Sequence, residues 1–187
     1  HNFFLDIGTP KNYLKAQYDF KRHLIKPAIF LDRDGTINED YGYVHKFENF
    51  KLKKNILETL KYLSSKKVYL FIVTNQAGIA KKKFTINDFN KFQIQFKKFF
   101  SKHNVYFDYI AFCPFHDKAL DLKYRKKTNY RKPGNLMVKN ILKMFHVDLK
   151  KSVFIGDQKK DFLCAKKSNL NFLYYSKDIL NNIKKYI

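Results

Sequence analysis

Two pairs of aspartates carry the clearest chemical signal in the sequence. Asp32 and Asp34 directly follow a short apolar stretch, and Asp157 and Asp161 follow another one. Residues two apart on a strand point the same way, so the side chains of Asp32 and Asp34 are expected to leave a strand end on one side. Like charges this close repel one another unless a cation lies between them or one is protonated. Mg²⁺, a hard cation that takes oxygen ligands, is therefore the expected partner of these carboxylates.

Groups that suit phosphate lie between the two acidic pairs. Thr74 and Asn75 end the most apolar stretch of the chain, and Arg131 and Lys132 precede a proline. A hydroxyl and an amide can donate hydrogen bonds to phosphate oxygens, and a cation can balance developing negative charge. Together with carboxylates for a metal and a nucleophile, these groups predict phosphoryl-transfer chemistry.

Such groups need a scaffold that brings several strand ends together. Apolar, β-rich stretches alternate with segments of helical spacing, which is typical of a parallel sheet with helices on both faces. Open sheets of this kind bind ligands in a crevice at the carboxyl ends of their strands. We predict a three-layer, Rossmann-like α/β fold with strands at 28–31, 68–73, 109–112, 153–155 and 170–174, and with helices at 56–63, after Thr85, at 136–145 and after 174.

The helix after Thr85 is predicted in more detail. Thr85 followed by Asp88 three residues later indicates a helix N-terminus. A stripe of aromatic residues then recurs at spacings of three and four, which predicts a core-facing side. The stripe consists of Phe89, Phe92, Phe96 and Phe99.

The order and spacing of these motifs resemble the haloacid dehalogenase superfamily of phosphohydrolases over residues 28–175. The resemblance implies that Asp32 is the nucleophile that takes up the phosphoryl group. It implies that Asp34 is general acid to the leaving oxygen and then base to the incoming water. Asp32, the backbone carbonyl of Asp34 and Asp157 would hold Mg²⁺. Asp161 would orient the motif lysine or a metal-bound water rather than bind the metal directly.

The same resemblance assigns the contacts to substrate. Thr74 and Asn75 would bind the transferring phosphate, and Thr36, in the same motif as the nucleophile, is also assigned to substrate binding. Lys132 would be a catalytic residue that balances the charge of nucleophile and phosphate.

Further strings narrow the resemblance to one branch. Tyr-Gly-Tyr-Val-His at 41–45, Thr-Asn-Gln-Ala-Gly-Ile at 74–79 and Arg-Lys-Pro-Gly at 131–134 resemble the D-glycero-D-manno-heptose 1,7-bisphosphate phosphatases. That resemblance implies a minimal cap, removal of the C7 phosphate, and a role in nucleotide-activated heptose for surface polysaccharide. It also implies that Arg131 contacts the second, non-reacting phosphate, a task that suits a planar guanidinium.

Relatives in this branch hold a structural zinc, and the sequence departs from that pattern. Cys113 is present, but Phe115 stands at the histidine position, and Thr128 and Tyr130 replace the later cysteines. His116 lies one residue further on. A closed zinc site needs four nitrogen or sulfur ligands. With Cys113 and His116 as the remaining candidates, we expect the zinc site to be lost and the loop to be held by aromatic packing or to stay mobile.

The net charge of +22 needs an explanation of its own. Only four of the 38 cationic residues are arginine, which is the residue preferred for bidentate recognition of phosphates and bases. The lysines are spread through the chain, so we interpret them as solvated surface and do not expect nucleic acid as a partner. A small phosphorylated sugar is the expected substrate, and the positive field would attract it.

Three alternatives stay open. A histidinol-phosphate phosphatase would use the same motifs on a substrate with one phosphate and a cationic amine. A nucleic-acid 3′-phosphatase would exploit the basic surface and bind DNA in a salt-sensitive way. A catalytically silent binding module would keep the carboxylates for structure; the intact motifs argue against it, and the altered zinc loop argues mildly for it.

Residues 1–26 precede the first predicted strand, so we expect an N-terminal appendage followed by a phosphatase domain at 27–187. The string Asp-Ile-Gly-Thr-Pro at 6–10 resembles the C-terminal end of sugar-phosphate nucleotidyltransferases. With His1 in place of Met, it implies a covalent or functional link to such an enzyme; the alternative is a helical extension that packs on the sheet. Two cysteines are too few for a disulfide framework, so a cytoplasmic location is expected. No apolar run is long enough for a membrane helix.

Overall fold

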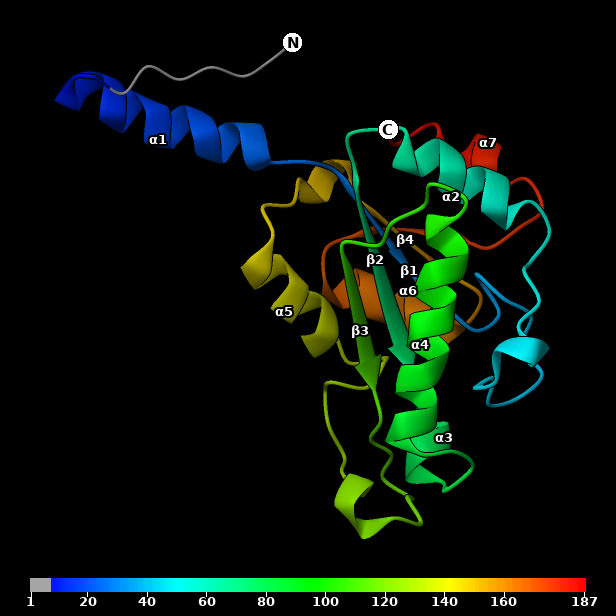
Figure 1. Ribbon diagram of the computed structural model, residues 1–187. Coiled ribbons are helices and arrows are strands. Elements are labelled where there is room, and N and C mark those ends of the chain that lie inside the picture. Colours follow the sequence, from blue (N-terminus) through cyan, green and yellow to red (C-terminus); the bar gives the residue numbers. More distant parts are fainter. Residues whose placement is uncertain (1–7) are drawn as a thin grey trace.

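The computed structural model describes residues 8–187, apart from the side chains of residues 17–23. Two residues of the string at 6–10, Asp6 and Ile7, lie outside the described residues. Within the described range, strands form one parallel sheet in the order β3-β2-β1-β4-β5 (Figure 1). They are β1 (Ala28–Leu31), β2 (Tyr69–Asn75), β3 (Tyr109–Cys113), β4 (Val153–Gly156) and β5 (Asn171–Tyr174).

Helices cover both faces of this sheet because alternate strand residues point to opposite sides. Ile29 and Leu31 of β1 belong to one apolar core, whereas Phe30 belongs to the other. The first core is closed by α2 (Ile56–Ser64), α4 (Ile86–Ser101) and α7 (Ile179–Ile183), and the second by α5 (Leu136–Met144) and α6 (Lys159–Lys167). The predicted three-layer α/β fold is therefore confirmed.

The helix predicted after Thr85 is α4, and it begins as expected. Thr85 Oγ1 accepts a hydrogen bond from the backbone N–H of Asp88 at 3.1 Å, and the Asp88 carboxylate accepts one from the Thr85 N–H in return. One part of the predicted stripe is wrong. Phe100, rather than Phe99, completes the buried row with Phe89, Phe92 and Phe96. Phe99 is half-buried because only a loop, through Phe47 and Phe50, covers it.

The strand order determines where polar side chains can gather. β1 lies between β2 and β4, and the chain builds the sheet outward from β1 first on one side and then on the other. Leu31 pairs with Ile72 of β2 and with Ile155 of β4. Asp32 follows directly and donates its N–H to the Ile155 carbonyl at 2.9 Å. The nucleophile candidate thus lies at the topological switch point, where open α/β sheets bind ligands.

Two loops flank this point, and they are short enough to count as a minimal cap. The first covers residues 39–55 and contains η1 (Phe47–Asn49); the second covers residues 114–135 and contains η2 (Leu122–Tyr124). The short helix α3 (Ala77–Ala80) follows β2, and η3 (Leu149–Lys151) precedes β4.

The N-terminal helix α1 (Pro10–Leu24) extends away from the sheet rather than packing on it (Figure 1). It is joined to the domain near its C-terminal end, where the Tyr69 hydroxyl donates to the Leu24 carbonyl at 3.0 Å. None of the helices within residues 8–187 has the length and hydrophobicity needed to cross a membrane.

Candidate active site

A cavity of about 330 Å³ opens at the carboxyl ends of the central strands. The first loop, α3 and the second loop form its walls. Most of the residues predicted from the motifs line it, together with groups from both loops. They are Asp32, Asp34, Asp40, Gly42, Tyr43, Thr74, Asn75, Gln76, Ala77, Gly78, Lys81, Arg131 and Lys160.

A buried ion-pair cluster of Asp32, Lys132 and Asp161 lies beside this cavity. Lys132 Nζ is 2.9 Å from Asp32 Oδ1 and 2.7 Å from Asp161 Oδ1, and the side chains of Lys132 and Asp161 are fully buried. Asn75 fixes the backbone of Lys132 from both sides, because its Oδ1 accepts the Lys132 N–H at 3.0 Å and its Nδ2 donates to the Lys132 carbonyl at 3.1 Å. The lysine is thereby held over the nucleophile candidate.

The electrostatics of this cluster follow from burial and from unequal charge. Burial raises the pKa of Asp32 from 3.8 to about 7, against the charge of Lys132, which lowers it. Burial also acts to lower the pKa of Lys132, but the charges of Asp32 and Asp161 outweigh it, so the pKa of Lys132 lies above its usual value. Two carboxylates share one ammonium, and a further cation beside them would favour the ionised form of Asp32.

Asp157 adds a third carboxylate to those of Asp32 and Asp161. One carboxylate oxygen from each of Asp32, Asp157 and Asp161 lies within 4.8 Å of the others. Oδ1 of Asp157 is buried and has no hydrogen-bond partner in the described part of the chain. Burial, and then the charge of Asp161, raises the pKa of Asp157. An oxygen-rich group with an unpaired buried acceptor fits Mg²⁺, in line with the predicted metal ligands Asp32 and Asp157.

Gly35 makes room for this arrangement, and its substitution tests it. Gly35 has φ +84°, and a Cβ there would overlap the carboxylate of Asp157. We expect Gly35→Ala to lower stability by roughly 1–3 kcal/mol through backbone strain and overlap, and to raise the Mg²⁺ concentration needed for half-maximal activity because Asp157 must move. Gly42→Ala is the matched control, since Gly42 has φ +81° but nothing within 4 Å of its Cβ position.

Thermal unfolding and a Mg²⁺ titration of activity distinguish the two effects. Gly42→Ala should lose stability through backbone strain alone and keep the Mg²⁺ dependence of the wild type. Equal Mg²⁺ dependence in both variants would contradict the placement of the metal at Asp157.

Asp34 is surrounded by hydrogen-bond donors. Arg33 contacts both of its oxygens, with distances of 2.9 to 3.0 Å. Asn38 Nδ2 donates to Oδ1 at 3.0 Å, and Gln76 Nε2 donates to Oδ2 at 2.9 Å. Sequence reasoning assigned no role to Arg33, Asn38 or Gln76. Their positions in the motifs that contain Asp34 and Thr74 are the one feature of the sequence that could have indicated a role at the site.

The two threonines differ in placement. Thr74 lines the cavity, and its Oγ1 accepts a hydrogen bond from Gln76 Nε2 at 2.9 Å. Thr36 is fully buried and is not among the residues that line the cavity. The structure therefore does not bring Thr36 to the cavity wall, and its predicted contact with substrate stays a prediction.

Three cationic side chains line the cavity. Arg131 is half-buried, and its Nη1 donates a weak hydrogen bond of 3.5 Å to the Phe115 carbonyl. Lys81 Nζ donates to the Tyr43 hydroxyl at 3.0 Å, which joins the first loop to the segment after α3. With Lys160 from α6, these side chains provide positive charge on the cavity wall, opposite in sign to its carboxylates.

The loop after β3 is packed by aromatic and backbone contacts. Cys113 is buried, and its Sγ lies 3.8 Å from the Phe115 carbonyl. His116 Nδ1 accepts the backbone N–H of Lys118 at 3.0 Å. The Phe115 and Tyr124 rings lie 6.2 Å apart, and Tyr130 packs on the second core. In the described residues, Asp32, Asp157 and Asp161 are the group of three or more His, Cys, Asp or Glu residues close enough to hold a metal.

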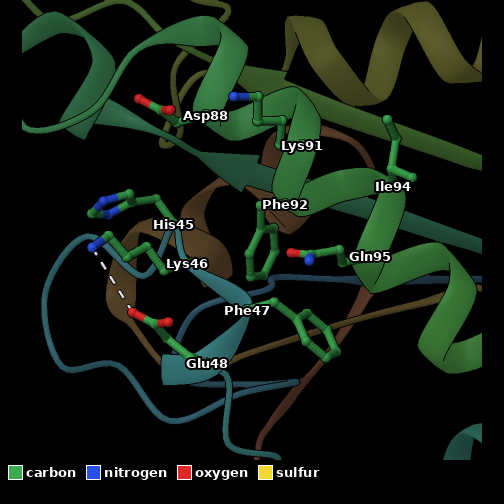
Figure 2. A pocket seen from close by; sticks show the side chains of 9 residues that line it. All are labelled: His45, Lys46, Phe47, Glu48, Asp88, Lys91, Phe92, Ile94 and Gln95. Carbon is green, nitrogen blue, oxygen red and sulfur yellow. Dashed lines mark ion pairs between the residues drawn. The ribbon is translucent and has the colours of Figure 1, made fainter.

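Two further candidates for chemistry are the second cysteine, Cys164, and a larger cavity. Cys164 is buried in α6, and burial raises the pKa of its thiol to about 11, which disfavours the thiolate. A larger cavity of about 740 Å³ lies between residues 45–48 and α4 (Figure 2). It shares no lining residue with the strand-end cavity, and none of the motif aspartates lines it. We therefore assign the chemistry to the smaller cavity.

Comparison with known proteins identifies the family of the chain. Residues 16–184 match the protein family described as polynucleotide kinase 3 phosphatase. The D-glycero-beta-D-manno-heptose-1,7-bisphosphate 7-phosphatase of Escherichia coli strain K12 is 35% identical over 144 residues, which cover 77% of this chain and 75% of the relative. The enzyme of the same name from Vibrio cholerae is 35% identical over 142 residues and covers 76% of each chain.

Solved structures show the same fold. A chain from Mesorhizobium loti described as a HAD-like phosphatase is 28% identical, with a TM-score of 0.71 over 78% of this chain and 70% of that one. The D,D-heptose 1,7-bisphosphate phosphatase of B. bronchiseptica, complexed with magnesium and phosphate, has a TM-score of 0.74 at 18% identity and covers 86% of this chain and 99% of that one. Motifs, fold and relatives agree, and the chain belongs to the polynucleotide kinase 3 phosphatase family, a group of phosphatases within the haloacid dehalogenase superfamily.

Proposed function

We propose that the protein is a Mg²⁺-dependent phosphatase that removes the C7 phosphate of D-glycero-D-manno-heptose 1,7-bisphosphate. The observation that carries this proposal is the buried ion-pair cluster beside a cavity whose wall bears Arg131, Lys81 and Lys160. A nucleophile with its own buried counter-ion suits one phosphate, and separate cations suit a second phosphate on the same sugar. The 35% identical relatives carry the name of this activity, with the β anomer specified.

The reaction would begin at Asp32. Its Oδ1 accepts the Arg33 N–H at 2.7 Å and faces Lys132 Nζ at 2.9 Å, so we infer that Oδ2 attacks phosphorus. As the bond from Asp32 to phosphorus forms, the bond from phosphorus to the C7 oxygen breaks. Asp34 gives its proton to that oxygen. Water then attacks the aspartyl phosphate, Asp34 takes a proton from it, and inorganic phosphate leaves with Asp32 restored.

The other residues would hold the transferring group. Thr74, on the cavity wall, donates to a phosphate oxygen, and Lys132 balances the charge that nucleophile and phosphate share. Asn75 positions Lys132 through hydrogen bonds to its backbone, in addition to the substrate contact predicted for it. Asp32, the backbone carbonyl of Asp34 and Asp157 would hold Mg²⁺, and Asp161 would orient Lys132. When bound, the metal supplies charge neutralisation between the phosphate and the carboxylates.

Phosphate release from a small panel of substrates tests the proposal. The panel holds both anomers of heptose 1,7-bisphosphate, histidinol phosphate and a 3′-phosphorylated oligonucleotide, with Mg²⁺ present. We expect the β anomer to have the highest kcat/KM and chelation of Mg²⁺ to abolish turnover. A higher kcat/KM for histidinol phosphate would overturn the sugar substrate while keeping the chemistry.

A nucleic-acid 3′-phosphatase is the second candidate, because the matching family is named for that activity and the net charge is +22. It would show as turnover of the oligonucleotide and as DNA binding that weakens steeply with salt. The confined cavity of about 330 Å³ and the scarcity of arginine favour the small sugar.

We infer that the loop at 114–135 works without zinc. Three of the four expected ligand positions carry no nitrogen or sulfur donor in the side chain. They are Phe115, Thr128 and Tyr130. The contact of Phe115 with Tyr124 supports a loop held by apolar packing. Elemental analysis of purified protein should give less than one zinc per ten chains, and a zinc-selective chelator should leave activity with Mg²⁺ unchanged. Stoichiometric zinc would contradict the inference.

We propose that residues 1–26 are an appendage without catalytic function, linked covalently or functionally to a sugar-phosphate nucleotidyltransferase. The outward course of α1 supports an appendage. A nucleotidyltransferase would act on the sugar 1-phosphate that the phosphatase releases, in a cytoplasmic route to surface polysaccharide. Deletion of residues 1–24 should leave kcat/KM within about twofold of the wild type; a large loss would tie α1 to catalysis.

A further inference from the structure

The carboxylate of Asp34 is held by a network that the assigned motif roles do not explain. Three side chains donate to it, and two of them, Arg33 and Gln76, also contact each other at 3.3 Å. We propose that Arg33 and Gln76 are positioning residues that aim the Asp34 carboxyl at the leaving oxygen. This inference rests on the proposed function, in which Asp34 transfers the proton.

Arg33 is placed where a cation is costly unless it has a specific partner. It is fully buried, and it is the largest fully buried side chain in the described part of the protein. Its guanidinium donates hydrogen bonds to both Asp34 oxygens. The side chain of Asp34 is 18% exposed and lines the cavity. The pair therefore presents the carboxyl to the cavity from a rigid, buried base. A planar fork restricts a carboxylate in two directions, which a single point charge does not.

The buried base extends to the surrounding loop and helix. Arg33 Nη2 donates to the Val44 carbonyl at 2.7 Å, which fixes it to the first loop. Its guanidinium carbon lies 4.7 Å from the centre of the Phe92 ring. Figure 2 shows Phe92 projecting from α4 toward the loop that carries Phe47. The guanidinium is thus confined between the first loop and an aromatic face, an arrangement that favours a cation in a desolvated place.

Gln76 ties the same carboxyl to the phosphate-binding end of β2. Its Oε1 accepts from Arg33, which assigns Nε2 as the donor to both Asp34 Oδ2 and Thr74 Oγ1, each at 2.9 Å. The Gln76 side chain is buried although it lines the cavity, with 3% of its surface exposed. Gln76 consequently fixes the distance between the proton-transfer group and the threonine that is proposed to bind the transferring phosphate. Misplacement by about 1 Å can cost roughly 10²-fold in rate.

The test uses the need of the leaving group for a proton. An alkoxide leaving group, as from the C7 position of heptose 1,7-bisphosphate, requires general acid catalysis. The nitrophenolate of p-nitrophenyl phosphate leaves without a proton. We expect Gln76→Leu to lower kcat/KM for the sugar bisphosphate by roughly 10- to 100-fold. The loss of kcat/KM for p-nitrophenyl phosphate should be much smaller, because only the loss of the contact with Thr74 is common to both substrates.

Controls separate positioning from general damage. Gln93→Leu removes another glutamine, on α4, whose buried amide atoms have no hydrogen-bond partner among the described residues. This variant should leave kcat/KM for both substrates unchanged. Arg33→Lys keeps the charge but loses the fork, and we expect the same selective loss as for Gln76→Leu. Equal losses on both substrates, or no loss, in Gln76→Leu and Arg33→Lys would overturn the inference.

Asp34→Asn provides the benchmark for the proposed function. It should show the largest selective loss on the sugar bisphosphate. If Asp34→Asn lowers kcat/KM equally for both substrates, then Asp34 is not the proton donor to the leaving oxygen and the proposed mechanism itself fails. The comparison uses kcat/KM because hydrolysis of the aspartyl phosphate, in which Asp34 is the base, is common to both substrates. If Asp34→Asn is selective and the two positioning variants are not, only the inference about Arg33 and Gln76 fails.

Discussion

Asp32→Asn is expected to lower kcat/KM for phosphate release by roughly 10⁴-fold or more, which is the scale of a lost nucleophile. The amide keeps the shape of the carboxylate but cannot form the bond to phosphorus. Phosphate release is measured with Mg²⁺ over a range of substrate concentrations. Glu58→Gln, which removes a charge from an exposed position on α2, is the control and should retain full activity. Substantial turnover by Asp32→Asn would refute Asp32 as nucleophile.

The stability of the same variant tests whether Asp32 is kept for structure, as it would be in a catalytically silent module. Burial raises the pKa of Asp32 in the folded protein to about 7, against 3.8 when unfolded. The metal-free protein therefore loses the contribution of Asp32 to its stability as pH rises from about 4 through 7, because ionised Asp32 is disfavoured in the folded state. Asp32→Asn removes this loss, and Lys132 keeps Asp161 as its partner. In a chelator, we expect the Tm of the variant to equal or exceed that of the wild type at pH 8, and the difference to shrink at pH 5.

The fold was predictable because its local signals agree. The strand at 28–31 is apolar at every position, and the structure buries all four residues of β1. Each predicted strand is found near its expected bounds. Asp32 follows β1, Thr74 lies at the end of β2 and Asp157 follows β4, and these three strands are neighbours in the sheet. Strand ends converge in a parallel sheet, so spacing along the chain was sufficient to predict that Asp32, Thr74 and Asp157 meet.

The supporting contacts could not be predicted because they depend on side-chain direction. Arg33 stands between two aspartates in sequence, and spacing alone does not say whether it points to solvent or into the core. The structure buries it because Phe92 and the Val44 carbonyl, from segments that follow later in the chain, form its surroundings. Asn75 was predicted to bind phosphate, but no local pattern indicates that its amide also holds the Lys132 backbone, 57 residues away. Tertiary contacts of this kind lie beyond local patterns.

Lys132→Met is expected to damage both stability and activity, for one electrostatic reason. Nζ of Lys132 is the ammonium that Asp32 and Asp161 share, and the side chains of Lys132 and Asp161 are fully buried. Its removal leaves the buried carboxyl groups of Asp32 and Asp161 without their counter-ion, which costs about 3–5 kcal/mol. For a domain of this size we expect a fall in Tm of roughly 10 °C at pH 8. Lys139→Met, at an exposed position on α5, should leave Tm and activity unchanged.

A second substitution separates the structural role of Lys132 from its catalytic role. In Lys132→Met, the added change Asp161→Asn removes one of the unpaired carboxylates, so the double variant should regain a large part of the lost Tm. Activity should stay lost, because no ammonium is left to balance the charge shared by Asp32 and the transferring phosphate. Recovery of Tm without recovery of kcat would assign both roles to the same Nζ. Recovery of activity together with Tm would mean that Lys132 supports the fold alone, and that Arg131 or the metal supplies the positive charge in the reaction.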